Sequence, residues 1–184
     1  MKFVLNTAID PHFCAIFSRE NELLDKLVWT ERAKDGANIY EFLAKQNPAK
    51  ISFCGGVSGP GGFASLRASA SVLTAISVAN KIPICQISAE KWIADFLGHE
   101  NFLLNTFGQA VWTVQNGKIS RDFPENIDKN RETVVEFLPD SKKKMFSNPL
   151  RISLDGLEES LLTALQEEKP QKTFIPHYKF PPVS

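Results

Sequence analysis

Residues 57–81, VSGPGGFASLRASASVLTAISVANK, decide the fold of this chain. A short apolar run ends in a glycine-rich turn, and the turn opens onto a helix that we predict over residues 63–81. No charged residue occurs from position 68 to position 80. A helix without a charged face is typically buried on all sides. The small side chains of this helix would also let a second helix approach closely.

The segments around this helix predict a mixed α/β fold. Three apolar runs at residues 2–8, 12–18 and 22–30 are separated by turn-forming clusters, which indicates an antiparallel meander. Helices and strands then alternate, and we predict them at residues 36–46, 51–57, 63–81, 82–88 and 89–98. This order is that of a ribonuclease-H-like half-domain, the unit that is duplicated in actin-like ATPases.

A change of composition near residue 100 predicts two subdomains. Residues 1–99 form the ribonuclease-H-like N-terminal subdomain, and residues 100–184 form a smaller, truncated α/β subdomain. Asn116-Gly117 is a strong hairpin turn signal between two of its strands. The proline-rich end of the chain, from residue 169, is expected to run extended across the surface.

The composition indicates a soluble, cytoplasmic globular protein. Lysine plus arginine and aspartate plus glutamate each number 21, so the basic excess typical of nucleic-acid-binding proteins is absent. The lysine run 142–144 is more typical of a solvated loop than of a basic patch. Three widely spaced cysteines in apolar runs favour buried thiols over disulfides. No apolar stretch approaches bilayer-spanning length.

Catalytic patterns are hard to find in this sequence. His12, His99 and His177 have no partner at helical spacing, so we expect surface or loop histidines and no metal site. No nucleophile elbow, zinc-protease or Walker motif occurs. We therefore predict no catalytic residue, no metal and no cofactor.

The glycine-rich turn has two interpretations. The backbone N–H groups of Gly59, Gly61 and Gly62, placed before a helix, could bind an anion or a nucleotide. However, Phe63 and Ala64 stand where a phosphate-binding loop has its lysine and hydroxyl, and proline at position 60 removes one N–H donor. A structural turn is the favoured interpretation.

The helix itself is the more informative feature. We predict a partner-binding interface made of two neighbouring helices, with the residues Tyr40, Phe42, Leu66, Ser69, Val72, Leu73 and Ile76. The chain is too small to cover both faces of the uncharged helix easily. The alternative is that the second subdomain covers these residues.

Four segments together resemble the TsaB family, also called YeaZ. Residues 59–67, GPGGFASLR, resemble the family motif GPGSFTGLR, and residues 82–90, IPICQISAE, resemble its LPxxGVSTLE segment. Residues 4–17, VLNTAIDPHFCAIF, are similar to LAIDTATxxCSVAL, and residues 176–179, PHYK, are similar to the PxYLR ending. The resemblance covers about the first hundred residues and the last few.

The resemblance implies an actin-like fold and a role in making threonylcarbamoyladenosine in tRNA. It implies a non-catalytic scaffold that pairs with a TsaD-like transferase through its N-terminal helices, contacts tRNA only indirectly and forms a homodimer in isolation. It leaves open whether a TsaE-like ATPase joins the complex.

Three departures indicate a divergent member. The family's first-strand aspartate falls at Asn6, the hydroxyls of its glycine motif are lost at Gly62 and Ala64, and residues 105–112 lack the aspartate and arginine of its DARxGEVY segment. Two alternatives stay open. One is a stand-alone actin-like enzyme, either an ATP-binding transferase or a glycoprotease-like hydrolase. The other is a homodimer that has lost the tRNA role.

Overall fold

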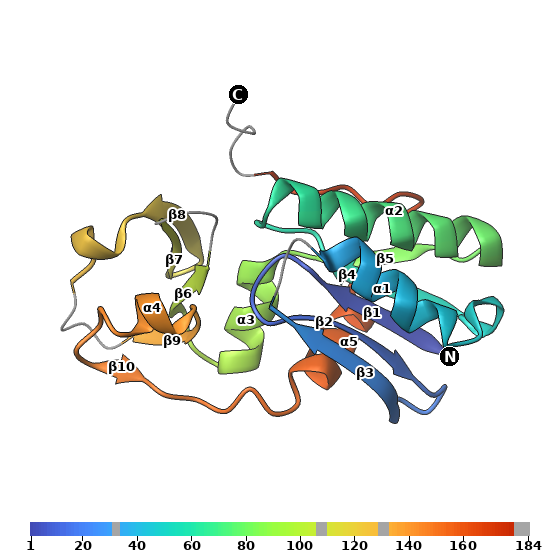
Figure 1. The fold of residues 1–184 in the computed structure, drawn as a ribbon, viewed down its shortest axis with the longest axis horizontal. Coiled ribbons are helices and arrows are strands. Elements are labelled where there is room, and N and C mark those ends of the chain that lie inside the picture. The colour runs from blue at the N-terminus through green and yellow to red at the C-terminus, as the bar shows by residue number, and fades with distance from the viewer. Residues whose placement is uncertain (31–33, 106–109, 129–132, 179–184) are drawn as a thin grey trace.

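Two five-stranded mixed sheets form the framework of the protein (Figure 1). The structure is a computed structural model that describes residues 1–30, 34–105, 110–128 and 133–178. The first sheet has the order β3-β2-β1-β4-β5, with β1 (Lys2–Asn6), β2 (His12–Phe17), β3 (Leu23–Trp29), β4 (Phe53–Val57) and β5 (Ile84–Ile87). β1, β2 and β3 are antiparallel, and β4 and β5 run parallel to β1. This sheet confirms the predicted ribonuclease-H-like connectivity.

Helices cover both faces of the first sheet. α1 (Asp35–Ala44) and α2 (Phe63–Asn80) lie side by side on one face, where they pack on side chains such as Phe3, Leu5 and Ile16 (Figure 1). α3 (Ala89–Leu97) and α5 (Leu157–Glu167) cover the other face. Neighbouring residues of β1 therefore contribute to two separate cores, as the alternation of a strand requires. Within the described residues, no helix combines the length and apolar character needed to cross a bilayer.

The second sheet repeats the strand order of the first. Its order is β10-β9-β6-β7-β8, with β6 (Asn101–Asn105), β7 (Val111–Gln115), β8 (Lys118–Asp122), β9 (Thr133–Phe137) and β10 (Pro149–Leu150). β7 and β8 form the predicted hairpin, in which Asn116 and Gly117 both have positive φ angles of 49° and 71°. The helices of this half are reduced, since only the four-residue α4 (Asp140–Lys143) lies between β9 and β10, whereas the 18-residue α2 lies between β4 and β5. The second half is smaller than the first, as predicted, but it repeats the strand order of the first sheet, which was not predicted.

The C-terminal part of the chain returns to the first half. α5 packs against β1, β4 and β5, and a methyl carbon of Leu165 lies 3.1 Å from the place where a Cβ on Gly55 would stand. Beyond α5, Gln171 forms an isolated antiparallel bridge with Ile84 of the edge strand β5. Phe174 is then buried in the same core as α1 and α2. Two short 3-10 helices, η2 (Pro48–Lys50) and η3 (Pro124–Asn126), complete the fold.

Candidate functional site

The predicted interface residues divide into exposed and buried groups. Tyr40 on α1 is 74% exposed, and Val72 on α2 is partly buried. The other five are packed inside this chain, with exposed fractions of 6% or less: Phe42, Leu66, Ser69, Leu73 and Ile76. They support the position of the helices on the sheet and are not surface residues in this conformation.

The structure leaves one face of α2 uncovered, as expected for a chain too small to cover both faces of this uncharged helix. Its outer face is exposed and is formed mainly by small residues, together with one aliphatic and one cationic side chain: Ala64, Arg67, Ser71, Ala75, Val78 and Ala79. Val78 is 73% exposed. The outer residues of α1, including Tyr40 and Ala44, lie beside this face because the two helices pack together. The accessible candidate surface is therefore the outer side of α1 and α2, which we call the α1–α2 face.

The buried serines of α2 explain why the accessible face of this helix is hard to identify from the sequence. Ser69 is fully buried, and its hydroxyl lies 2.6 Å from that of Thr7, whose hydroxyl also donates to the carbonyl of Ser65. Ser77 is buried as well and donates to the carbonyl of Ile82. Buried hydroxyls with partners are tolerated in a core, so polar residues occupy the inner side of this helix while Val78 faces outward.

Close packing accounts for two glycines of the turn before α2. A Cβ on Gly59, whose φ is +126°, would lie 2.5 Å from the carbonyl oxygen of His177. A Cβ on Gly61 would lie 2.7 Å from the Cα of Ala8. Real Cβ atoms do not approach other atoms so closely, and the structural turn explains these glycines without a ligand. Gly62 is the partly exposed N-cap residue of α2.

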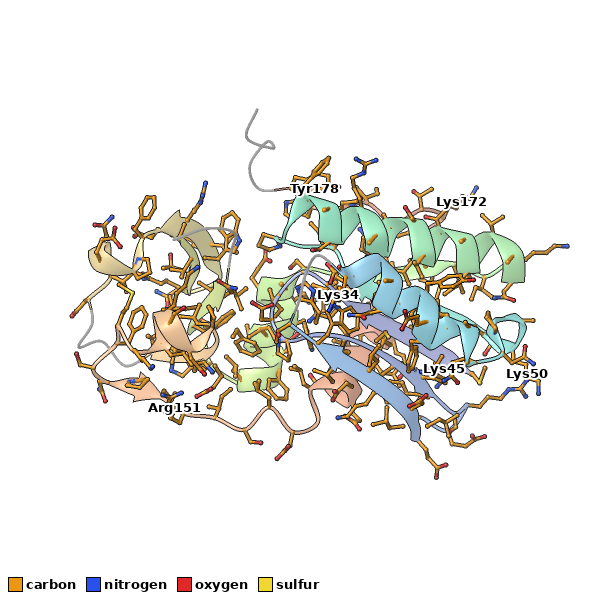
Figure 2. All side chains as sticks on the ribbon, in the orientation of Figure 1. Lys34, Lys45, Lys50, Arg151, Lys172 and Tyr178 are labelled. Atoms are coloured by element: carbon orange, nitrogen blue, oxygen red, sulfur yellow. The ribbon has the colours of Figure 1, made fainter. Side chains whose placement is uncertain are left out.

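The end of the described chain closes over this turn. The N–H group of His177 donates to the carbonyl of Ser58 over 2.6 Å. The next residue, Tyr178, places its ring 5.0 Å from the ring of Phe63, and the guanidinium of Arg67 lies 5.3 Å from the same phenyl ring. Figure 2 shows Tyr178 at the N-terminal end of α2. The PHYK ending is thus next to the GPGGFASLR segment in space, although its Lys179 lies outside the described residues.

A buried polar cluster lies at the start of β2, and it corrects the prediction for His12. This histidine is fully buried, and its Nδ1 lies 2.7 Å from Oδ1 of Asp35, which also accepts a hydrogen bond from Trp29 Nε1 over 2.6 Å. On the other side of the ring, Nε2 lies 3.6 Å from Oδ1 of Asp10. His12 is therefore a core residue between two carboxylates and not a surface or loop residue.

The charge of Asp35 is stabilised in this cluster. Burial alone would raise the pKa of Asp35, but the hydrogen bond and charge of His12 outweigh it, with smaller contributions from Ser65 and Trp29. The net result is a pKa below the ordinary value for an aspartate. Asp35 is thus an anion at neutral pH, and it lies in the first turn of α1, where the helix dipole favours a negative charge.

The cluster continues into the second half of the protein. Asp10 accepts a hydrogen bond from the side chain of Asn105, which in turn accepts one from Lys142 Nζ over 2.9 Å. Lys142 is only 7% exposed and also donates to the carbonyl of Ala110 over 2.7 Å. The interpretation of residues 142–144 as a solvated loop is therefore wrong at Lys142, which links β6 to α4.

Asn6 has a structural role that an aspartate could not perform. Its amide nitrogen donates to the carbonyls of Ile9 and Pro11, and its amide oxygen accepts from the N–H of Ala8 over 3.1 Å. An ionised aspartate has no donor for the first two bonds. The asparagine at this position thus closes the turn between β1 and β2.

This arrangement holds the two halves together and leaves little room for catalysis. His12 has no exposed surface, so no substrate atom reaches its ring in this conformation. Among the described residues, no group of three or more His, Cys, Asp or Glu side chains is arranged to hold a metal ion. Of the DARxGEVY-like segment at 105–112, residues 106–109 lie outside the described part of the chain. No sequence pattern identifies Asp10, Asp35 or Asn105 as members of this cluster, because their partners are distant along the chain.

Of the comparisons with known proteins, only the one with solved structures assigns a fold. No protein-family model matches the chain, and no curated protein matches its sequence. Among solved structures, YeaZ from Pseudomonas aeruginosa matches with a TM-score of 0.60 and 17% identity over 97% of this chain and 100% of that chain. An uncharacterized protein with similarity to peptidase YeaZ from Pseudomonas aeruginosa matches with a TM-score of 0.58 and 15% identity over 97% and 99%. The chain therefore has the YeaZ fold over nearly its whole length, and the predicted resemblance is confirmed at the level of the fold.

Proposed function

We propose that this protein is a TsaB-like accessory subunit that supports threonylcarbamoyladenosine formation in tRNA. The observation that carries the proposal is the match of the full chain to YeaZ, both halves included. On this proposal the protein acts in the cytoplasm and performs no chemistry itself. It holds a TsaD-like transferase in its active arrangement, and a TsaE-like ATPase is a further candidate partner.

The α1–α2 face is the surface that we assign to the transferase. Its small residues, such as Ala75 and Ser71, allow a partner helix to approach closely. Tyr40 is 74% exposed, and tyrosine is one of the residue types that anchor protein interfaces. Val78, which is 73% exposed, adds apolar surface to this face. This surface replaces the buried residues that the sequence alone suggested.

Co-expression with the TsaD-like protein of the same organism tests the proposal. We expect the two proteins to co-purify as a complex. The substitution Ala75→Arg should abolish co-purification, because an arginine cannot be accommodated where two helices meet closely. Thr163→Arg on the exposed side of α5 is the matched control and should leave the complex intact.

Two results would refute this assignment. If no complex forms with wild-type protein, the accessory role is wrong. If the complex survives Ala75→Arg while the folded protein is unchanged, the surface is misplaced. A homodimer disrupted by Ala75→Arg, without any complex with the transferase, would favour the alternative of a homodimer without the tRNA role. The enzymatic alternative receives no support from His12, since its ring is buried.

A further inference from the structure

Two adjoining grooves at the end of the molecule opposite the glycine-rich turn carry the next inference. The first is an open groove of about 700 Å³ beside η2 and the start of β1, and its lining includes Ser18, Arg19, Lys50 and Ser52. The second, of about 350 Å³, lies between the end of α2 and the C-terminal segment, and its lining includes Lys81 and Lys172. Ile82 lines both grooves, so they lie on either side of this residue.

The charged side chains that line the two grooves are all positive. Each groove is lined by two cationic side chains, and none of the described residues that line the grooves is acidic. The four cationic side chains are all exposed: Arg19, Lys50, Lys81 and Lys172. None of them forms an ion pair with a residue in the described part of the chain. Figure 2 shows Lys50 near the N-terminus and Lys172 along the C-terminal half of α2. A chain of zero net charge thus concentrates positive charge in its concave surface at this end.

The pKa of the Met1 amino group is affected by the positive charges near the first groove. This pKa is lowered, first by burial and then by the charges of Arg19 and Lys2. Glu20 acts in the opposite direction with a smaller effect than these, and Lys50 lowers the pKa least. These cations therefore act together on one point. A positive concave surface with low-dielectric walls focuses the field and attracts anions.

The chemistry and shape select the class of ligand. The grooves are also lined by residues with hydroxyl and amide groups: Ser18, Ser52, Asn80 and Gln171. Such groups can form hydrogen bonds with phosphate and ribose oxygens. A single phosphate would engage one groove, whereas two adjoining grooves suit a polymer with regularly spaced phosphates. A planar bilayer cannot enter a concave surface. No tyrosine, phenylalanine or tryptophan is among the described lining residues, so base stacking does not contribute here.

We propose that these two grooves bind the sugar–phosphate backbone of a folded RNA. The choice of RNA over DNA rests on the proposed function, whereas the phosphate-binding role rests on the grooves alone. The first groove has no lining residue in common with the α1–α2 face, whereas Val78 lines the second groove and also belongs to that face. RNA bound in the second groove would therefore lie next to a docked transferase. The interaction is an electrostatic one without sequence readout, since phosphate contacts position a ligand and do not specify its bases.

Fluorescence anisotropy with a fluorescein-labelled RNA hairpin tests the proposal on the full chain. We expect a Kd of about 10⁻⁶–10⁻⁴ M at physiological salt, with log Kd rising linearly with log salt concentration. Arg19→Gln with Lys50→Gln removes the charges of the first groove, and Lys81→Asn with Lys172→Gln removes those of the second. Each double variant should lower the salt slope by about 1.5, from ~0.7–0.9 per phosphate contact, and weaken binding on the order of tenfold.

The matched control removes two exposed cations of the second subdomain, with Lys118→Gln and Lys144→Gln. It should leave the Kd and the salt slope unchanged. Equal loss in the control and in the groove variants would overturn the site, as would an absence of binding by wild-type protein. Tighter or equal binding of a DNA hairpin would overturn the choice of RNA. If a double variant fails to fold, Lys50→Glu alone provides the same readout.

Failure of this proposal can be separated from failure of the proposed function. The groove variants leave the α1–α2 face intact, so they should still co-purify with the TsaD-like protein. Loss of RNA binding with retained complex formation supports both proposals together. RNA binding without any complex would support the grooves and refute the accessory role.

Discussion

Replacing Asp35 by alanine should strongly destabilise the protein. The Asp35 carboxylate accepts from Trp29 Nε1 over 2.6 Å and lies 2.7 Å from His12 Nδ1, in a region closed to solvent. Hydrogen bonds to a charged group contribute about 1.5–3 kcal/mol each. Breaking a buried charge pair by removing one partner costs about 3–5 kcal/mol. We therefore expect Asp35→Ala to lower the free energy of unfolding by about 3–5 kcal/mol.

Urea unfolding followed by the fluorescence of the three tryptophans measures this loss, and one of them, Trp29, donates to Asp35. With a dependence on urea of about 2 kcal/mol per M, the midpoint should fall by roughly 1.5–2.5 M. Asp95→Ala, on the exposed side of α3, is the control and should stay within about 0.5 kcal/mol of wild type. A change below about 1 kcal/mol in Asp35→Ala would show that the cluster does not stabilise the fold.

The pH dependence of stability in a second variant, Asp35→Asn, provides a further check. The pKa of Asp35 is lowered in the folded protein, so at acidic pH the unfolded chain binds this proton more readily than the folded chain. The stabilisation from Asp35 is therefore complete above the ordinary carboxyl pKa of about 3.9 and is lost as the pH falls from there through the lower folded-state value. The difference in stability between wild type and Asp35→Asn should shrink over that acidic range. A difference that grows toward low pH would contradict the charge assigned to Asp35.

Three further predictions concern packing and burial. Gly61→Ala should lower the melting temperature, because its Cβ would meet the backbone of Ala8 at 2.7 Å and overpacking costs about 1–3 kcal/mol. Gly36→Ala is the control, because the space around Gly36 is open. It should be neutral or raise the free energy of unfolding by up to about 1 kcal/mol. Lys142→Met should lower the free energy of unfolding by about 1–3 kcal/mol in a urea titration, because the acceptors of its hydrogen bonds lose their donor. An unchanged free energy of unfolding would refute the link between β6 and α4. The three cysteine thiols are buried, and burial raises the pKa of Cys54 to about 12, so a thiol reagent at pH 8 should react with none of them until the protein unfolds.

Local signals in the sequence were sufficient for the order of strands and helices. The Asn116-Gly117 turn, the apolar strand runs and the long α2 each depend on neighbouring residues, and the structure has all of them. Strand order in the first sheet followed because only a few arrangements satisfy short, right-handed connections. The repeat of this order in the second sheet escaped prediction, since β10 has only two residues and α4 only four.

The candidate site was harder to predict because its contacts are distant along the chain. His12 and Asp35 are 23 positions apart, Asn105 and Asp10 are 95 apart, and Lys142 and Asn105 are 37 apart. No periodic pattern connects residues at such separations. The four cations of the grooves likewise come from four segments, so a net charge of zero concealed them.

The inner face of α2 was misjudged for a different reason. Hydrophobic patterning assumes that polar side chains point outward. Here Ser65, Ser69 and Ser77 point inward, while Val78 is exposed. The contrast between the two faces is therefore weak, and the sequence could not show which side of the helix is accessible.

The return of α5 to the first sheet has a consequence for the order in which the protein can fold. During synthesis, β1 to β5 emerge long before Leu161 and Leu165, which cover one face of that sheet. The N-terminal half therefore leaves the ribosome with an uncovered apolar face, a state prone to aggregation. We expect residues 1–99 expressed alone to be poorly soluble, and addition of a peptide spanning residues 154–178 to restore solubility. The segment that covers this face of the first sheet, α5, is therefore synthesised late.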